Sequence, residues 1–81
     1  MQVVNFKRVL VCDVRVTEFE GKDYYSLLIY SDNQLSRISI TSGQVELFRK
    51  YIGKYISLEA ELKIYDGKLK YKYTGNEIKE G

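Results

Sequence analysis

The stretch Tyr24–Thr41 has the sequence Tyr-Tyr-Ser-Leu-Leu-Ile-Tyr-Ser-Asp-Asn-Gln-Leu-Ser-Arg-Ile-Ser-Ile-Thr. Two short apolar runs flank the turn formers Ser31-Asp32-Asn33, which predicts a strand, a tight turn and a second strand. Side chains alternate between the two faces of a strand, so apolar residues at every second position mark the face that packs into a core. The expected core positions are Tyr25, Leu27, Ile29, Ile38 and Ile40.

The opposite face of this hairpin has a different chemistry. By the same alternation it carries Tyr24, Ser26, Leu28 and Tyr30 on the first strand and Leu35, Arg37 and Ser39 on the second. Tyrosine rings can stack on bases, and the guanidinium group of Arg37 suits both phosphate contact and stacking. A mixed surface of this kind can also be merely solvated. The hairpin therefore offers either a ligand-binding face or an ordinary exposed one.

The residues before this hairpin predict a long first strand. Val3–Val16 is rich in β-branched residues at a period of two. A strand of this length in a small domain usually bends and changes partners along its course. Its expected apolar face consists of Leu10, Cys12, Val14 and Val16. Cys12 would then be a small buried residue rather than a reactive thiol.

A loop is expected between the first two strands, over Thr17–Asp23. Gly21 would provide its turn, because glycine adopts the backbone angles that tight turns require. Phe19 is an aromatic residue among acids near the tip of this loop. It either folds back onto the end of the domain or stacks on a base.

A short helix is predicted over Gln44–Ile52, after the first hairpin. Val45, Phe48 and Ile52 fall on one face of such a helix. Gly53 stands where a C-cap glycine belongs. We expect this helix to be a structural plug with one apolar face.

The last hairpin has the clearest pattern in the chain. Tyr55–Tyr65 alternates strictly, Asp66-Gly67 is a strong hairpin turn signal, and Lys68–Thr74 returns as the last strand. The residues expected to face inward are Ile56, Leu58, Ala60, Leu62 and Ile64 on the first of these strands and Leu69, Tyr71 and Tyr73 on the second. The remaining Gly75–Gly81 is expected to be a polar tail.

The order of predicted elements is strand, strand, strand, short helix, strand, strand, in a single domain of residues 1–81. Five strands with one apolar face each can close into a small barrel, which removes exposed sheet edges. We therefore predict an all-β fold, a five-stranded barrel with one short helix between strands three and four. This order, and the segment Tyr51–Leu58 with the sequence Tyr-Ile-Gly-Lys-Tyr-Ile-Ser-Leu, resemble an OB-fold. In that fold the helix commonly ends in a glycine that leads into strand four.

A second resemblance is to small single-stranded-DNA-binding proteins of phages and mobile elements, of the filamentous-phage gene V type. Gly21–Leu27, Gly-Lys-Asp-Tyr-Tyr-Ser-Leu, is similar to the Gly-Lys-Pro-Tyr-Ser-Leu turn of that family, with one residue more. Either Tyr24 or Tyr25 therefore takes the family's base-stacking position. The resemblance implies a protein that coats single strands during replication. A single OB-fold covers few nucleotides, so we also expect a homodimer.

The expected binding groove of an OB-fold crosses strands two and three, between the first-to-second and fourth-to-fifth strand loops. Binding without sequence preference needs aromatic faces for the bases and cations for the backbone. The residues that meet these needs at the expected places are Arg15, Phe19, Lys22, Tyr24, Tyr25, Tyr30, Arg37, Lys63, Tyr65, Lys68 and Lys70. Outward lysines on a last strand, such as Lys70 and Lys72, can equally protect an exposed edge.

Composition narrows the possible functions. The chain has no histidine and one cysteine, so a Cys/His metal site cannot form within one chain and the commonest general base is missing. Glu59 and Glu61 lie on one strand face, where pairing with nearby lysines is simpler than carboxylate catalysis. We expect that the protein is not an enzyme and that it binds neither a metal ion nor a cofactor. No apolar run approaches the ~18–20 residues that cross a bilayer, and the N-terminus lacks a signal-peptide core. We therefore expect a cytoplasmic protein with no membrane or small-molecule partner.

Two alternatives to single-stranded DNA stay open. The net charge of +2 is only a weak sign of nucleic-acid binding. An RNA-binding OB domain would use the same aromatic residues as a DNA-binding one. An OB-like module that binds protein is favoured by the acids Glu18, Glu20 and Asp23 beside the expected groove.

Overall fold

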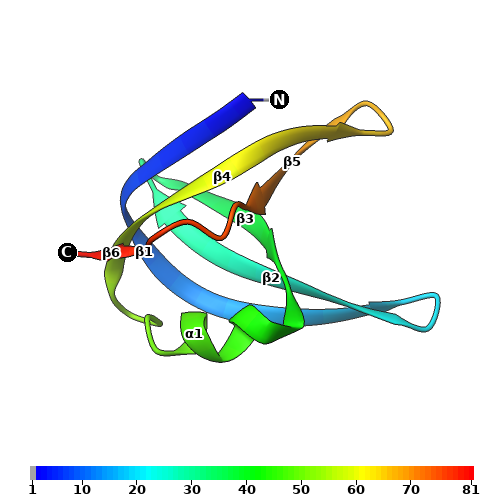
Figure 1. Ribbon diagram of the computed structural model, residues 1–81, viewed down its shortest axis with the longest axis horizontal. Helices are drawn as coiled ribbons and strands as arrows, with labels where there is room; N and C mark the ends of the chain where they lie inside the picture. The colour runs from blue at the N-terminus through cyan, green and yellow to red at the C-terminus, as the bar shows by residue number, and fades with distance from the viewer. Residues whose placement is uncertain (1) are drawn as a thin grey trace.

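The computed structural model describes residues 2–81 and shows a closed five-stranded β-barrel (Figure 1). Its strands are β1 (Gln2–Phe19), β2 (Lys22–Ser31), β3 (Gln34–Ile40), β4 (Tyr55–Tyr65) and β5 (Lys68–Tyr73). They neighbour one another in the order β1–β2–β3–β5–β4, and β4 pairs again with β1. All pairings are antiparallel except the one between β3 and β5. The predicted fold class, an OB-like barrel with one short helix between β3 and β4, is confirmed.

The long strand β1 changes partners, as its length predicted. Residues 2–10 pair with β4 and residues 10–19 with β2. Two bulges interrupt the pairing, at Arg8 and at Cys12. Arg8 has a φ of 49°, and its backbone N–H donates to the Ser57 hydroxyl at 3.0 Å. The strand can therefore curve around the barrel without losing its place in the sheet.

The bulges also correct the predicted faces of β1. Each bulge inserts one residue, so it switches which of two alternating positions points inward. Before Cys12 the buried residues are Val9 and Val11 rather than Leu10. After it, Val14 packs against the core as predicted. Cys12 itself is exposed, so the prediction that it is buried is wrong.

Three hairpins end in two-residue turns with positive φ at both residues. These turns are Glu20-Gly21 (51° and 76°), Asp32-Asn33 (52° and 61°) and Asp66-Gly67 (48° and 76°). Positive φ at both positions matches the right-handed twist of the flanking strands. The predicted loop Thr17–Asp23 is accordingly reduced to the turn at Glu20-Gly21, and the strands extend almost to its tip.

The helix that plugs the barrel is shorter than predicted. A 3-10 turn (Ser42–Gln44) leads into α1 (Val45–Arg49), and Gly53 adopts the expected left-handed conformation, with a φ of 85°. Val45 and Phe48 are buried in the core, but Ile52 lies beyond the helix and is exposed. The ring of Phe48 contacts that of Tyr73 edge to face, with centroids 5.1 Å apart.

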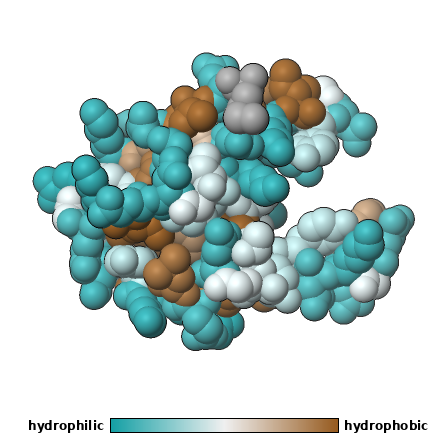
Figure 2. Space-filling model, in the orientation of Figure 1, coloured by the Kyte–Doolittle hydropathy of each residue, from teal (hydrophilic) through white to brown (hydrophobic). Residues whose placement is uncertain are grey.

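Two hairpins extend past the core from the same side of the barrel (Figure 1). We call the part formed by residues 15–24 the β1–β2 arm and the part formed by residues 63–70 the β4–β5 arm. The space-filling view shows a hollow between them (Figure 2). Ile64 and Leu69 lie on the second arm and are 71% and 64% exposed, so the prediction that they face the core is wrong. The strand pattern continues beyond the point where the barrel can cover it.

The C-terminal residues are more ordered than a polar tail. Ile78 packs against the core, and β6 (Lys79–Glu80) pairs with the start of β4. Over residues 2–81, no helix has both the length and the apolar character needed to cross a bilayer.

Candidate nucleic-acid interface

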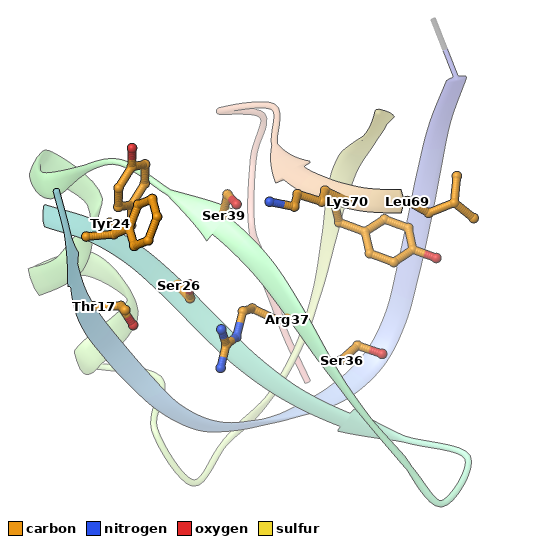
Figure 3. Close-up of a pocket in the computed structure, with 10 residues that line it drawn as sticks. Thr17, Tyr24, Ser26, Ser36, Arg37, Ser39, Leu69 and Lys70 are labelled. Atoms are coloured by element: carbon orange, nitrogen blue, oxygen red, sulfur yellow. The ribbon is translucent and has the colours of Figure 1, made fainter. Parts of the chain in front are cut away.

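A groove of about 640 Å³ lies between the two arms (Figures 2 and 3). Strands β1, β2, β3 and β5 contribute its lining. The residues that line it are Thr17 and Phe19 of β1, Tyr24 and Ser26 of β2, Ser36, Arg37 and Ser39 of β3, and Leu69, Lys70 and Tyr71 of β5. This is the place where the sequence predicts the binding groove.

Strand register explains why these side chains gather. Residues that pair across neighbouring strands share a face of the sheet. Arg15 pairs with Ser26, Ser26 with Ser39, and Ser39 with Lys72, so one row of outer-face residues crosses four strands. Ser26 lies at the bottom of this row and is only 8% exposed. The next row along β1 and β2 contains Thr17 and Tyr24. The outer face is therefore continuous from the β1–β2 arm to β5.

Two cations in the groove are available to a ligand. Arg37 lies near the middle of the groove, and the side chain of Lys70 extends from β5 toward Ser39 (Figure 3). Within residues 2–81, neither cation belongs to an ion pair. The Lys70 ammonium group lies 5.8 Å from the centre of the Tyr65 ring, a cation–π arrangement that leaves its charge exposed to solvent. None of the ten described lining residues carries a carboxylate.

Three aromatic rings contribute to the groove, and they differ in freedom. Phe19 and Tyr24 are exposed near the end of the β1–β2 arm. Phe19 therefore does not fold back onto the barrel. Tyr71 is half-buried, with its ring edge to face against Phe6 at 5.1 Å. The first two rings are free to stack on bases, while the third is a fixed part of the wall.

The structure separates the two adjacent tyrosines of the β2 motif. Tyr24 faces the groove and pairs with Thr17, whereas Tyr25 is half-buried against the core and pairs with Ile40. Tyr25 therefore lies on the opposite face from the predicted ligand. Tyr24 is the residue in a position to stack.

The remaining predicted residues lie outside the groove lining. Arg15 and Lys22 share the outer face of the β1–β2 arm, although Arg15 also approaches Asp13 at 3.6 Å. Tyr30 lies at the far end of β2, where its hydroxyl donates to Asn33 at 3.2 Å. The outer face of the β4–β5 arm carries Lys63, Tyr65 and Lys68 beside Lys70. These arm residues can extend a basic surface away from the groove.

Six lining residues were not among the predicted site residues. Four are hydroxyl side chains, Thr17, Ser26, Ser36 and Ser39, and the other two are Leu69 and Tyr71. Alternation places Ser26 and Ser39 outward beside Tyr24 and Arg37, so the sequence contained a signal for these two. No local signal identifies Leu69, because its exposure depends on where the barrel stops.

Metal-binding groups do not accompany this surface. Across residues 2–81, no cluster of three or more His, Cys, Asp or Glu side chains is arranged to hold a metal ion.

Comparison with protein families, curated proteins and solved structures gave no match for this chain. We therefore base its function on the barrel topology and on the chemistry of the groove.

Proposed function

We propose that this protein binds single-stranded DNA with little sequence preference in the groove between its two arms. The observation that carries this proposal is a groove whose described lining combines exposed aromatic faces with unpaired cations and carries no carboxylate. Phe19 and Tyr24 supply stacking faces, and Arg37 and Lys70 supply charge for the phosphates. Base stacking on an aromatic side chain contributes about 1–3 kcal/mol per base and tolerates any base.

The groove hydroxyls add a second kind of contact. Thr17 shares a row with Tyr24, and Ser26 and Ser39 lie in the next row toward Arg37. Hydroxyl groups donate hydrogen bonds to phosphate oxygens, and such contacts position the sugar-phosphate backbone of the DNA without selecting a base sequence. The small serine side chains also leave room for a strand to approach the sheet. These features support binding through shape and backbone rather than through base identity.

The biological role we propose is the coating of single strands during replication of a phage or mobile element, which rests on the likeness of Gly21–Leu27 to the gene V family. A homodimer would double the number of nucleotides held, because one OB-fold covers only a few. Lys63 and Lys68 on the β4–β5 arm would extend the phosphate contacts beyond the groove.

Fluorescence anisotropy with a labelled deoxythymidine oligomer of about 20 nucleotides tests this proposal. We expect tight binding at low salt that weakens steeply as the salt concentration is raised. Lys and Arg side chains that contact phosphates release the counterions condensed on the strand, and added salt opposes this release. A uridine oligomer of the same length, added as competitor, distinguishes DNA from RNA as the preferred ligand. Absence of binding at low salt would overturn the proposal, and a stronger effect of the RNA competitor would redirect it to RNA.

A further inference from the structure

The groove coincides with a split between two strands of the barrel. β3 and β5 form only two residue pairs, Ile38 with Tyr71 and Ser39 with Lys72. Continued in parallel register, the next pairs would be Arg37 with Lys70 and Ser36 with Leu69. These four residues instead line the groove from opposite sides (Figure 3).

Within residues 2–81, the split leaves two strand edges without a partner. Residues 34–37 of β3 pair with β2 on one side only, and residues 68–70 of β5 pair with β4 on one side only. Backbone N–H and C=O groups at such edges are a ready template for an added strand. Many domains bind extended peptides in this way, with main-chain hydrogen bonds for affinity and alternating side chains for specificity.

The inner and outer faces of the sheet differ in chemistry at the split. On the side that continues the barrel interior, Leu69 pairs with Ile64, and both side chains are largely exposed. On the outer side, Arg37 and Lys70 carry unpaired positive charge. Side chains alternate between the two faces of a strand. A strand inserted between β3 and β5 would therefore place every second side chain against the apolar groups and the others beside the cations.

We propose that the split between β3 and β5 binds an extended segment of a partner protein in which acidic and apolar residues alternate. The segment adds as a strand, with its apolar side chains against Leu69 and Ile64 and its carboxylates beside Arg37 and Lys70. This partner is additional to single-stranded DNA. Because both ligands use Arg37 and Lys70, they compete, and the peptide displaces DNA from the groove.

The probe is a labelled peptide of about ten residues in which Glu and Val alternate, a length that covers the open edges. Its control has the same composition in two blocks, five Glu followed by five Val, so the charge is unchanged and the alternation is lost. We expect the alternating peptide to bind about tenfold more tightly than the block peptide. Equal binding would overturn the proposal, because it would show attraction by charge alone.

The strand-addition step has its own test. N-methylation of the backbone amides of the alternating peptide removes the hydrogen-bond donors and keeps the side chains. We expect this peptide to lose measurable binding. Binding equal to that of the unmethylated peptide would overturn the proposed strand addition.

Protein variants connect the probe to the split. Leu69→Ser is expected to weaken the alternating peptide about tenfold, since it removes an apolar contact from an exposed position with little effect on folding. Leu47→Ser makes the same substitution on α1, away from the split, at a position that is 39% exposed against 64% for Leu69, and should bind as the unchanged protein does. An equal effect of both variants would overturn the assignment to the split.

The deoxythymidine oligomer separates this proposal from the DNA-binding one. Leu69→Ser should retain oligomer binding, because Leu69 offers neither a ring nor a charge. If the peptide binds and the oligomer does not, the DNA-binding proposal is overturned and strand addition stands. If the oligomer binds and the peptide does not, strand addition is overturned and DNA binding stands. If both ligands bind at the same time, the proposed competition is overturned.

Discussion

The barrel body and the two arms use the same alternating sequence pattern with opposite results. On β4, Ile56 belongs to the body and is fully buried, while Ile64 lies on the same face of the same strand and is 71% exposed. The difference arises because the body is closed by neighbouring strands and by Phe48 of the helix, whereas Ile64 of the arm pairs, among residues 2–81, with its hairpin partner Leu69 alone. Local pattern selects a face, and closure of the barrel decides whether that face is buried. The arms are therefore free to bind ligands while the body supplies stability.

The largest expected effect separates the body from the arms. Phe48→Ala removes a fully buried ring from the core and should lower the free energy of unfolding by about 3–5 kcal/mol. Phe19→Ala removes a ring of the same size from an exposed arm position and should change it by less than about 0.5 kcal/mol. Urea denaturation measures both. Similar losses in the two variants would mean that the arm contributes to the core.

The next effect tests the arm as a ligand-binding region. Tyr24→Leu removes a stacking ring from the groove and should weaken oligomer binding by about 1–3 kcal/mol. Tyr55→Leu is its matched control, since the two rings are 52% and 50% exposed and Tyr55 lies outside the groove lining. Fluorescence anisotropy at constant salt gives the comparison. If the two variants bind equally, base stacking takes place elsewhere.

A smaller effect concerns the charge in the groove. Arg37→Gln should reduce the dependence of log affinity on log salt by about one unit, because one phosphate contact is lost. Arg49→Gln is the control, since Arg49 pairs with Glu46 at 2.9 Å on the helix rather than lining the groove. Titrations at four or more salt concentrations give both slopes. An unchanged slope for Arg37→Gln would place the phosphates away from β3.

Much of the fold follows from local sequence, and the predictions fail where the whole barrel decides the outcome. The bounds of β4, the turn at Asp66-Gly67 and the order of the elements are all visible in alternation and turn chemistry. The faces of β1 are not, because the bulges at Arg8 and Cys12 reverse the alternation without any glycine to mark them. A bulge is set by the curvature that the whole barrel imposes. A single strand pattern does not contain that curvature.

The candidate site shows the same division. Tyr24 and Arg37 are recognisable from the sequence, because alternation places both on the outer face of the hairpin, where a ring and a cation are accessible to a ligand. Alternation also places Tyr25 on the core face with Leu27, and the register that pairs it with Ile40 agrees. The split between β3 and β5 is a property of two segments about 30 residues apart in the chain, so no local pattern predicts the groove lining at Leu69.

The smallest effect lies where the body meets the β4–β5 arm, at Tyr73. Its hydroxyl donates to the backbone carbonyl of Asn76, and burial raises the pKa of Tyr73 above its ordinary value of 10.0, with a further contribution from nearby Tyr51. A raised pKa in the folded state means that the unfolded chain loses this proton first as pH increases. The stability that Tyr73 contributes is therefore complete below about pH 10 and is lost as pH rises through its folded-state pKa.

Tyr73→Phe tests that dependence. At neutral pH the variant should lose about 1 kcal/mol with its hydrogen bond. Above about pH 10 its free energy of unfolding should fall less steeply than that of the unchanged protein, so the two curves converge. Tyr65→Phe, on an exposed ring of the arm, controls for the loss of a hydroxyl group. Urea denaturation across this pH range decides the matter, and parallel curves would show that Tyr73 ionises equally in the folded and unfolded chains.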